Sequence, residues 1–195
     1  MKKFGPLLVV GVIVIVLLAM LVPSYNGFVD KEENVGKAYA QVENQLQRRL
    51  DLIPNLVNTV KGYVQHERET LEAVMEARSK ATSITVDPSN ITPEQFAEYQ
   101  KAQSGVTSAL GRLLAVAENY PDLKANQQFL ELQAQLEGTE NRIEVAREDY
   151  NKASKSFNSS VRKFPTNLFA SIFGFEMYDY YEAEEGAEIA PQVQF

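Results

Sequence analysis

A seven-residue repeat in the second half of the chain constrains its fold more than any other feature. Between residues 118 and 164, mostly apolar residues recur at alternating spacings of three and four, and Ser160 is the one polar interruption. Glu, Gln, Lys, Arg and Asn fill the positions between them. This pattern predicts a long amphipathic helix whose seam packs against partner helices. The seam positions are Phe129, Leu132, Leu136, Thr139, Ile143, Ala146, Tyr150, Ala153, Phe157 and Phe164.

An uncharged run of 20 residues, residues 4–23, lies near the start of the chain. As a helix it would be about 30 Å long, which matches the hydrocarbon core of a bilayer. A secretory signal peptide is the alternative, but its apolar core usually has about 7–15 residues. The weak cleavage candidate here, Val22-Pro-Ser24, also has a proline just before the cut. We therefore predict an uncleaved single-pass transmembrane anchor over residues 1–23.

The charged residues on either side of this run predict its orientation. Lys2 and Lys3 precede it, whereas the flank that follows is mainly acidic around residues 30–37. The positive-inside rule then places the N-terminus in the cytoplasm and the helical body outside it.

Helical periodicity predicts two helices between residues 25 and 81. The first is expected to end near Arg49-Leu50, because Pro54 disfavours helical geometry at the residue before it and removes a donor. Asp51 is the expected cap of the second helix, which would have Pro54 in its first turn and run to about Ala81.

A third helix is predicted after a loop over residues 82–90. It begins at Thr92-Pro93-Glu94-Gln95, which has the pattern of a capping box with proline at the first helical position. Tyr120-Pro121-Asp122 forms the corner before the fourth and longest helix. Four amphipathic helices with short connections predict an all-α fold, an antiparallel four-helix bundle over residues 24–175. Residues 176–195 contain six acidic and no basic side chains and are predicted to be a flexible tail.

A nearly uncharged segment follows the long helix at residues 164–175. We expect it either to lie at the bilayer surface or to cover the end of the bundle. With the end of the long helix it supplies the candidates for membrane contact or assembly, which are Phe157, Phe164, Leu168, Phe169, Ile172, Phe173 and Phe175.

Composition excludes several functional classes. The chain has no cysteine and one histidine, His66, so disulfides, thiolate metal sites and two-histidine metal sites are excluded. Residues 24–195 carry 17 basic and 26 acidic side chains, and a net charge of −9 argues against a nucleic-acid partner. No phosphate-binding loop or nucleophile elbow occurs. We expect no catalytic residue, no metal and no cofactor.

Two polar clusters remain. One is Arg48-Arg49 with Asp51, and the other lies on the long helix around Glu140. Surface ion pairing is the ordinary interpretation. The alternative is a buried polar network that fixes helix register, with Asn141 pointing inward. The candidates for such a network are Arg49, Asp51, Glu140, Asn141 and Arg142.

Several motifs resemble the LemA family of bacterial membrane proteins. They are QLQRRLDLIPNLVNTVKGY (45–63), NYPDLKANQQFLELQ (119–133), ENRIEVAREDYN (140–151) and FPTNLFASIFGF (164–175), after an apolar N-terminus. The resemblance implies a four-helix bundle on one N-terminal transmembrane helix in the bacterial cytoplasmic (inner) membrane, and it implies no reaction. It extends to magnetosome-associated relatives, which implies a role in membrane organisation.

Together these observations predict a non-enzymatic, membrane-anchored bundle that self-associates or scaffolds proteins at the membrane. The expected partners are the membrane, further copies of the chain and an unidentified membrane protein. The alternative is an extracytoplasmic sensor or signal-relay module that acts through a membrane partner.

Overall fold

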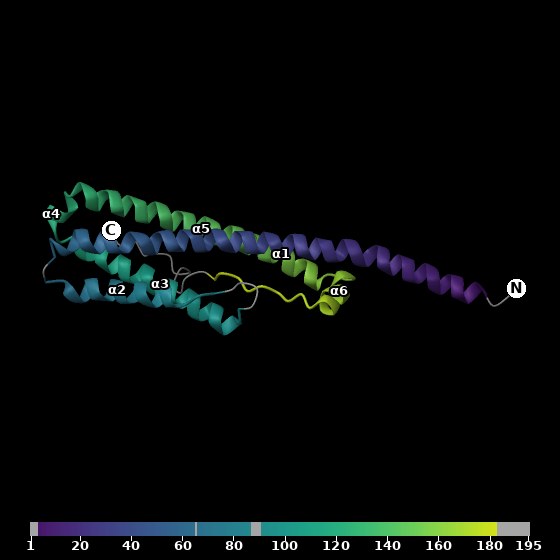
Figure 1. The fold of residues 1–195 in the computed structure, drawn as a ribbon. Helices are drawn as coiled ribbons and strands as arrows, with labels where there is room; N and C mark the ends of the chain where they lie inside the picture. The colour runs from purple at the N-terminus through teal and green to yellow at the C-terminus, as the bar shows by residue number, and fades with distance from the viewer. Residues whose placement is uncertain (1–3, 65, 87–90, 183–195) are drawn as a thin grey trace, which may run out of the picture. The chain divides into compact units, whose positions relative to one another are not determined.

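The computed structural model contains six helices in the residues that it describes, which are 4–64, 66–86 and 91–182. Within α1 the side chains of residues 4–7, 13, 14 and 16–18 are not described. The described residues contain no strand, so the all-α prediction is confirmed. The helices are α1 (Phe4–Lys61), α2 (Arg68–Ser83), α3 (Pro93–Ala117), α4 (Pro121–Lys124), α5 (Gln127–Arg162) and α6 (Thr166–Phe173) (Figure 1).

The chain divides into two compact units. Unit 1 consists of Met1–Ala38 and Tyr150–Tyr180, and unit 2 consists of Tyr39–Asp149 and Tyr181–Phe195. Helices α1 and α5 are therefore each divided between the two units, with one part in unit 1 and the other in unit 2. Each unit is described by itself below.

Unit 2 is built around one apolar core to which five helices contribute. The last turns of α1 supply Ile53, Leu56 and Val60, which are completely buried. Helix α2 packs against α3. Leu113, near the C-terminal end of α3, and Leu123, in the short α4, are buried in the same cluster. Burial of each such side chain stabilises the fold by about 1.5–3 kcal/mol.

Helix α1 passes through Pro54 without a break, so the prediction that a helix ends near Arg49-Leu50 and a second begins at Asp51 is wrong. A proline within a helix leaves the carbonyl four residues earlier without its donor. Here that carbonyl belongs to Leu50, and the Arg78 Nε of α2 donates to it at 2.9 Å. The buried apolar residues on both sides of Pro54 add the packing energy that holds the helix together.

The chain turns instead between α1 and α2, where residues 62–64 and 66–67 are non-helical. The backbone N–H groups of Tyr63 and Val64 both donate to the Val60 carbonyl, at 2.9 and 3.2 Å. The single predicted helix over residues 51–81 is thus divided between the end of α1 and α2.

The predicted start of the third helix is confirmed. The Gln95 backbone N–H donates to Thr92 Oγ1 at 3.3 Å, and the Thr92 N–H donates to Gln95 Oε1 at 3.0 Å, with Pro93 as the first helical residue. Of the loop predicted over residues 82–90, residues 84–86 are non-helical, whereas residues 82 and 83 still belong to α2 and residues 87–90 lie outside the described residues.

The long helix predicted as the fourth corresponds to α5. Its seam is confirmed from Phe129 to Tyr150, where every predicted position is buried. Beyond Tyr150, Ser154 is buried in place of the predicted Ala153, which is only partly buried, and Phe157 is buried as predicted. An α-helix has 3.6 residues per turn, so a strict seven-residue stripe drifts by about 20° per heptad and must skip a residue. At 36 residues α5 is long, but α1 has 58 residues and is the longer helix.

The predicted transmembrane anchor lies at the N-terminal end of α1. Among the residues that are described, the structure contains no helix that is both long and apolar enough to cross a membrane. The anchor prediction is therefore not confirmed. Residues 1–3 and several side chains of the predicted anchor lie outside the described residues, as do residues 183–195 of the predicted acidic tail.

Candidate functional site

A buried arginine links three helices inside unit 2. The Arg49 side chain of α1 has no exposed surface. Its Nη1 donates to Thr107 Oγ1 at 2.8 Å and to Glu140 Oε2 at 3.1 Å. Its Nη2 donates to the backbone oxygen of Gln103 at 3.1 Å and to Gln103 Oε1 at 2.9 Å. The guanidinium thus connects α1 to α3 and α5 through one set of hydrogen bonds.

Charge balance makes this network sensitive to its partners. A buried charge is tolerated only where it is paired and hydrogen-bonded. The Glu140 carboxylate supplies the opposite charge, and 36% of its side chain is exposed, so it remains partly hydrated. The directional donors of the guanidinium allow one relative register of the three helices. This arrangement can fix a packing geometry, and it contains no acid–base pair poised over a cavity.

The network includes two of the five predicted polar residues, Arg49 and Glu140. Asp51 instead accepts a hydrogen bond from Gln47 Nε2 at 2.8 Å on the surface of its own helix. Asn141 and Arg142 are exposed, so the expectation that Asn141 points inward is wrong. Position 140 lies beside the buried Thr139 and Ile143, whereas position 141 is turned by a further 100°.

Sequence reasoning missed the α3 partners, Gln103 and Thr107. Gln103 is 3% exposed and lies among buried apolar residues of α3. The available signal was a glutamine at helical spacing from Tyr99 and Val106 on the apolar face. An amide on such a face needs a buried partner, and Arg49 supplies it.

A second polar group lies nearby in unit 2, on α1 and α3. The pKa of the Tyr99 hydroxyl is raised to about 12, mainly by burial and also by the Glu43 carboxylate, although a hydrogen bond with Tyr39 opposes this rise. Loss of hydration also raises the pKa of the Glu43 carboxyl, and the Tyr39 hydroxyl, which donates to it at 3.5 Å, lowers it. A tyrosine with so high a pKa stays protonated at neutral pH and does not act as a base there.

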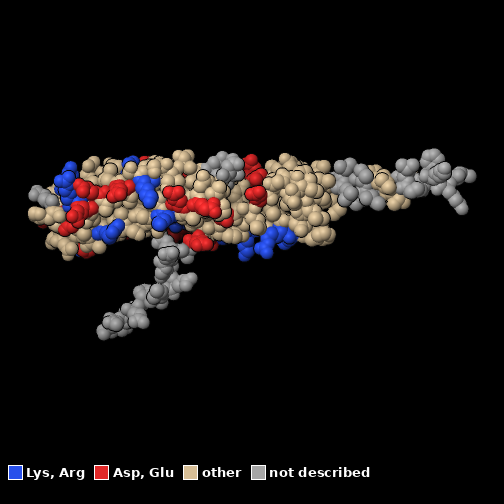
Figure 2. All heavy atoms as spheres, turned by 90° about the horizontal axis from the view of Figure 1, so that it is seen from below, with Lys and Arg blue, Asp and Glu red and all other residues tan. Residues whose placement is uncertain are grey.

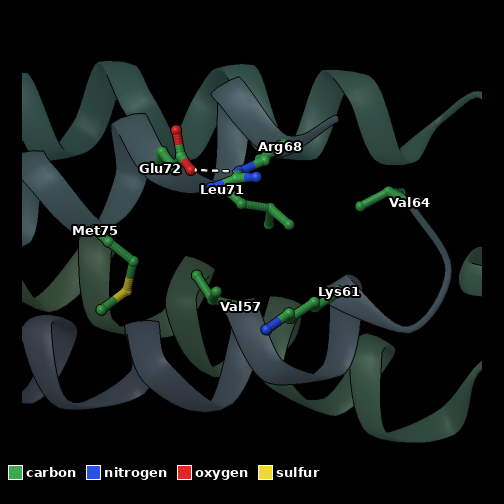
Figure 3. A pocket seen from close by; sticks show the side chains of 7 residues that line it. All are labelled: Val57, Lys61, Val64, Arg68, Leu71, Glu72 and Met75. Carbon is green, nitrogen blue, oxygen red and sulfur yellow. Dashed lines mark hydrogen bonds and ion pairs between the residues drawn. The ribbon is translucent and has the colours of Figure 1, made fainter. Parts of the chain in front are cut away.

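A pocket of about 640 Å³ opens between the end of α1 and the start of α2 (Figure 3). Val57, Val64, Leu71 and Met75 form its apolar wall, and three charged residues line the rest. Two of these, Arg68 and Glu72, pair with each other across one turn of α2, at 2.6 Å from Nε to Oε1. The third is Lys61. The described lining of the pocket thus combines four apolar side chains with three charged ones.

The described residues contain no group of three or more His, Asp or Glu side chains that could hold a metal ion. His66 is exposed in the turn between α1 and α2.

Unit 1 contains an aromatic cluster that joins α1, α5 and α6. The Phe28 ring of α1 lies 6.4 Å from the ring of Phe157 and 4.9 Å from that of Phe175. Tyr25 lies 5.0 Å from Phe173, ring centre to ring centre. Aromatic pairs at these separations each contribute about 0.5–1.5 kcal/mol beyond their buried area. This cluster docks α6 on α1.

The predicted membrane or assembly candidates divide into two sets. Phe157 and Phe169 are buried, and Phe173 and Phe175 are half-buried in the aromatic cluster. Phe157 is therefore covered within unit 1 and offers no exposed surface for membrane contact or assembly. Phe164, Leu168 and Ile172 face away from the cluster and are 81%, 55% and 71% exposed. Figure 2 shows that the part of the surface over α6 carries neither sign of charge.

Beyond α6 the chain stays attached to its own helices. Asn158 holds Tyr178 on both sides, since its Oδ1 accepts from the Tyr178 N–H at 2.9 Å and its Nδ2 donates to the Tyr178 carbonyl at 2.8 Å. In unit 2, Tyr181 packs its ring 5.1 Å from that of Phe96, and the Arg147 guanidinium lies 5.3 Å from the Tyr181 ring centre. The start of the predicted tail, residues 176–182, is thus partly packed.

Comparison with known proteins found a matching family model and several bacterial relatives. The family model described as the LemA family matches residues 38–195. Magnetosome protein MamQ 2 of Paramagnetospirillum magneticum is 28% identical over 208 residues, which cover 96% of this chain and 76% of that protein. MamQ of Magnetospirillum gryphiswaldense is 25% identical, with 92% of this chain and 73% of that protein covered. Protein LemA of Metamycoplasma hominis is 27% identical, with 82% and 69% covered.

The family match extends over most of the chain and includes Arg49, Gln103, Glu140 and those members of the aromatic cluster that lie between Phe157 and Phe175. The chain therefore belongs to the LemA family.

Proposed function

We propose that this protein is a non-enzymatic helical protein that associates with a bacterial membrane through residues 4–23 and organises proteins there, either by self-association or as a scaffold. One observation carries the proposal. The first part of α1 exposes large apolar side chains at successive turns without a charged residue among them. Contiguous exposed apolar surface of this kind marks contact with a membrane or a partner. These side chains are Leu8, Val9, Val10, Val12, Ile15, Met20 and Val22.

The continuity of α1 supports an anchoring role for this segment. The same helix continues from the apolar segment to Phe28 and Val35, which are fully buried in unit 1. A force on the membrane-bound part is thereby transmitted to the packed protein without an intervening loop. The proposal includes the predicted orientation, with the N-terminus in the cytoplasm and the helical body outside it.

The arrangement of unit 2 supports a structural role rather than catalysis. Its core draws on α1, α2, α3 and α5, and we propose that these segments form the predicted antiparallel four-helix bundle. The central polar group of this core, Arg49, is used in helix-to-helix hydrogen bonds. Similarity to proteins named as magnetosome proteins supports a role in membrane organisation.

Flotation of the full chain with liposomes tests membrane association. The wild type is expected to float with the vesicles, and a Val12→Asp/Ile15→Asp variant is expected to stay in the dense fraction, because each carboxylate in the hydrocarbon core costs about 2.5–3.5 kcal/mol. Val145→Asp is the matched control, since Val145 is 58% exposed on α5 in unit 2. Wild-type protein that remains in the dense fraction would refute the proposal.

Light scattering of the detergent-solubilised full chain tests self-association. The expected result is a mass that exceeds one chain and rises with protein concentration. A monomer at every concentration would contradict self-association and leave only the proposal that the protein is a scaffold for other proteins.

A further inference from the structure

Unit 1 arranges its side chains in three layers along α1. The uncharged run ends at Pro23, an aromatic layer follows with Tyr25 and Phe28, and the first charged residue of α1 is Asp30. The polar layer then contacts α5 and the segment after α6, since Lys31 Nζ donates to Ser160 Oγ and the Tyr178 hydroxyl donates to Glu32 Oε1 at 3.4 Å. Apolar, aromatic and polar layers in this order are the profile of a membrane–water interface.

Helix α6 lies at the level of the aromatic layer. Its inner face holds Phe169 and Ala170, which are buried, and Phe173, whose ring contacts Tyr25. Tyr25 follows the end of the uncharged run by two residues, which is about 3 Å along the helix axis. The docked α6 is therefore held next to the place where the uncharged run ends.

The outer face of α6 carries no charge and exposes two large apolar side chains, Leu168 and Ile172, together with the polar side chains of Asn167 and Ser171. Leu168 and Ile172 are one helical turn apart on this face, and the exposed Phe164 lies two residues before the helix begins. No charged residue occurs from Phe164 to Phe175, whereas Arg162 and Lys163 immediately before this segment are both exposed. A short apolar face with cations at its edge fits a lipid surface with anionic headgroups.

We propose that α6 is a second membrane contact, and that Phe164, Leu168 and Ile172 insert into the interfacial region of an anionic bilayer while Arg162 and Lys163 meet the headgroups. This inference rests on the proposed membrane association through residues 4–23. In this proposal the inner face of α6 packs in unit 1, and its outer face contacts the lipid. The contact fixes unit 1 against the bilayer in addition to the attachment through α1.

The absence of tryptophan from the chain allows a direct test. A single tryptophan introduced by substitution is the only one in the full chain, and brominated lipids quench only a tryptophan that is in contact with acyl chains. Leu168→Trp is reconstituted in phosphatidylcholine–phosphatidylglycerol vesicles with and without brominated phosphatidylcholine. The expected result is blue-shifted emission and a loss of emission in the brominated vesicles. Ile172→Trp is the second variant and is expected to behave in the same way.

Two further positions separate the possible outcomes. Val145→Trp, on an exposed position of unit 2, is expected to show neither the shift nor the quenching. Met20→Trp reports on the uncharged run itself. Quenching of Met20→Trp without quenching of Leu168→Trp and Ile172→Trp would overturn the α6 contact and leave the proposed function standing. Absence of quenching at all three positions would contradict both.

A third outcome distinguishes lipid from protein as the cover of α6. Blue-shifted emission of Leu168→Trp without quenching by brominated lipid would mean that another copy of the chain covers this face, and it would overturn the lipid contact. Vesicles of pure phosphatidylcholine test the role of the two cations. Quenching is expected to be weaker there than with phosphatidylglycerol, and equal quenching would remove Arg162 and Lys163 from the proposal.

Discussion

At the scale of single residues, the Arg49 network is the most specific feature of unit 2. Its carboxylate partner, Glu140, sits on a helix whose other polar residues are mostly in solvent, so removal of this one carboxylate leaves a buried positive charge without compensation. Loss of a hydrogen bond to a charged group costs about 1.5–3 kcal/mol. The partial exposure of Glu140 and the remaining bonds to Gln103 and Thr107 place the expected cost toward the lower end of this range.

We predict that Glu140→Ala lowers the free energy of unfolding by about 1–2 kcal/mol. The measurement is urea denaturation of the detergent-solubilised full chain, followed by far-ultraviolet circular dichroism. Glu144→Ala removes an exposed carboxylate from the next turn of the same helix and is expected to change stability by less than about 0.5 kcal/mol. Equal effects of the two substitutions would mean that Arg49 does not depend on Glu140.

The buried hydroxyl of Tyr99 predicts a loss of stability at alkaline pH. Its pKa in the folded protein is about 12, whereas an unfolded tyrosine has a pKa near 10. The folded state therefore binds its proton more tightly, and the stability contributed by the protonated hydroxyl is complete below pH 10 and is lost as the pH rises toward 12.

Tyr99→Phe is expected to reduce the fall in unfolding free energy between pH 9 and pH 11.5, because phenylalanine has no proton to lose. Urea denaturation at both pH values provides the comparison. Tyr63→Phe is the control, since Tyr63 is 38% exposed in the turn after α1. If Tyr99→Phe and the wild type lose the same stability over this interval, the hydroxyl is not protected in the folded state.

At the scale of helices, the chain shows which sequence signals decide a helix end. Local rules predict that Pro54 ends a helix, but Arg78, which is 28 positions away from Leu50 in the sequence, provides the missing donor for the Leu50 carbonyl. No local rule contains such a contact. The actual end was marked by Gly62 directly after Lys61, which matches the preference for a basic residue in the last turn and glycine just after it.

The contact between Arg78 and the Leu50 carbonyl makes a prediction for a pair of substitutions. Arg78→Ala is expected to lower the unfolding free energy by about 1–3 kcal/mol, since it leaves a buried carbonyl without a donor. In a Pro54→Ala background the new backbone N–H can bond to the same carbonyl, so the cost of Arg78→Ala is expected to become smaller.

A double-mutant cycle by urea denaturation measures this coupling. Lys80→Ala, an exposed substitution near the end of α2, provides the control for a lost positive charge. Equal costs of Arg78→Ala with and without Pro54 would show that the arginine does not replace the missing donor.

The prediction of the seam was confirmed from Phe129 to Tyr150, whereas the predicted assembly residues are partly buried and partly exposed, and this difference has a physical reason. Periodicity along one helix identifies which residues face inward, and it succeeded from Phe129 to Tyr150. It cannot show which helix covers a position beyond that. Phe157 is covered because Phe28 of α1 and Phe175 after α6 meet it, whereas Phe164 lies past the end of α5 and is exposed.

This contrast gives a matched pair of substitutions in unit 1. Phe157→Ala is expected to cost about 3–5 kcal/mol, because it removes a fully buried ring and leaves a cavity. Phe164→Ala is expected to change stability by less than about 0.5 kcal/mol in detergent. Hydrogen exchange of α6 in the detergent-solubilised chain provides a local readout. Increased exchange in the Phe164 variant as large as that in the Phe157 variant would contradict the assignment of two faces to this segment.

At the scale of the whole molecule, helical periodicity predicts the all-α class and the resemblance of several motifs identifies the family, and both predictions are confirmed. The α3 partners of Arg49 and the docking of α6 were not predictable, since both depend on contacts between segments far apart in the chain. The same limit applies to function, because no pattern in the sequence names a partner. What the structure adds is the location of exposed apolar surface, which lies on the first part of α1 and on the outer face of α6.

The absence of cysteine allows the proposed orientation to be tested in cells. A single cysteine introduced by Ser156→Cys, at an exposed position of α5, is expected to react with a membrane-impermeant maleimide added to intact spheroplasts. Lys2→Cys is expected to react only after the cells are lysed. The opposite pattern would reverse the orientation and would leave the membrane association itself unaffected.

Extraction of bacterial membranes at alkaline pH tests the central claim most directly. Membranes from cells that produce the full chain are washed in carbonate, which removes peripheral proteins and leaves embedded ones in the pellet. The account predicts that the wild type stays in the pellet and that the Val12→Asp/Ile15→Asp variant moves toward the supernatant. Wild-type protein recovered in the supernatant would contradict the account.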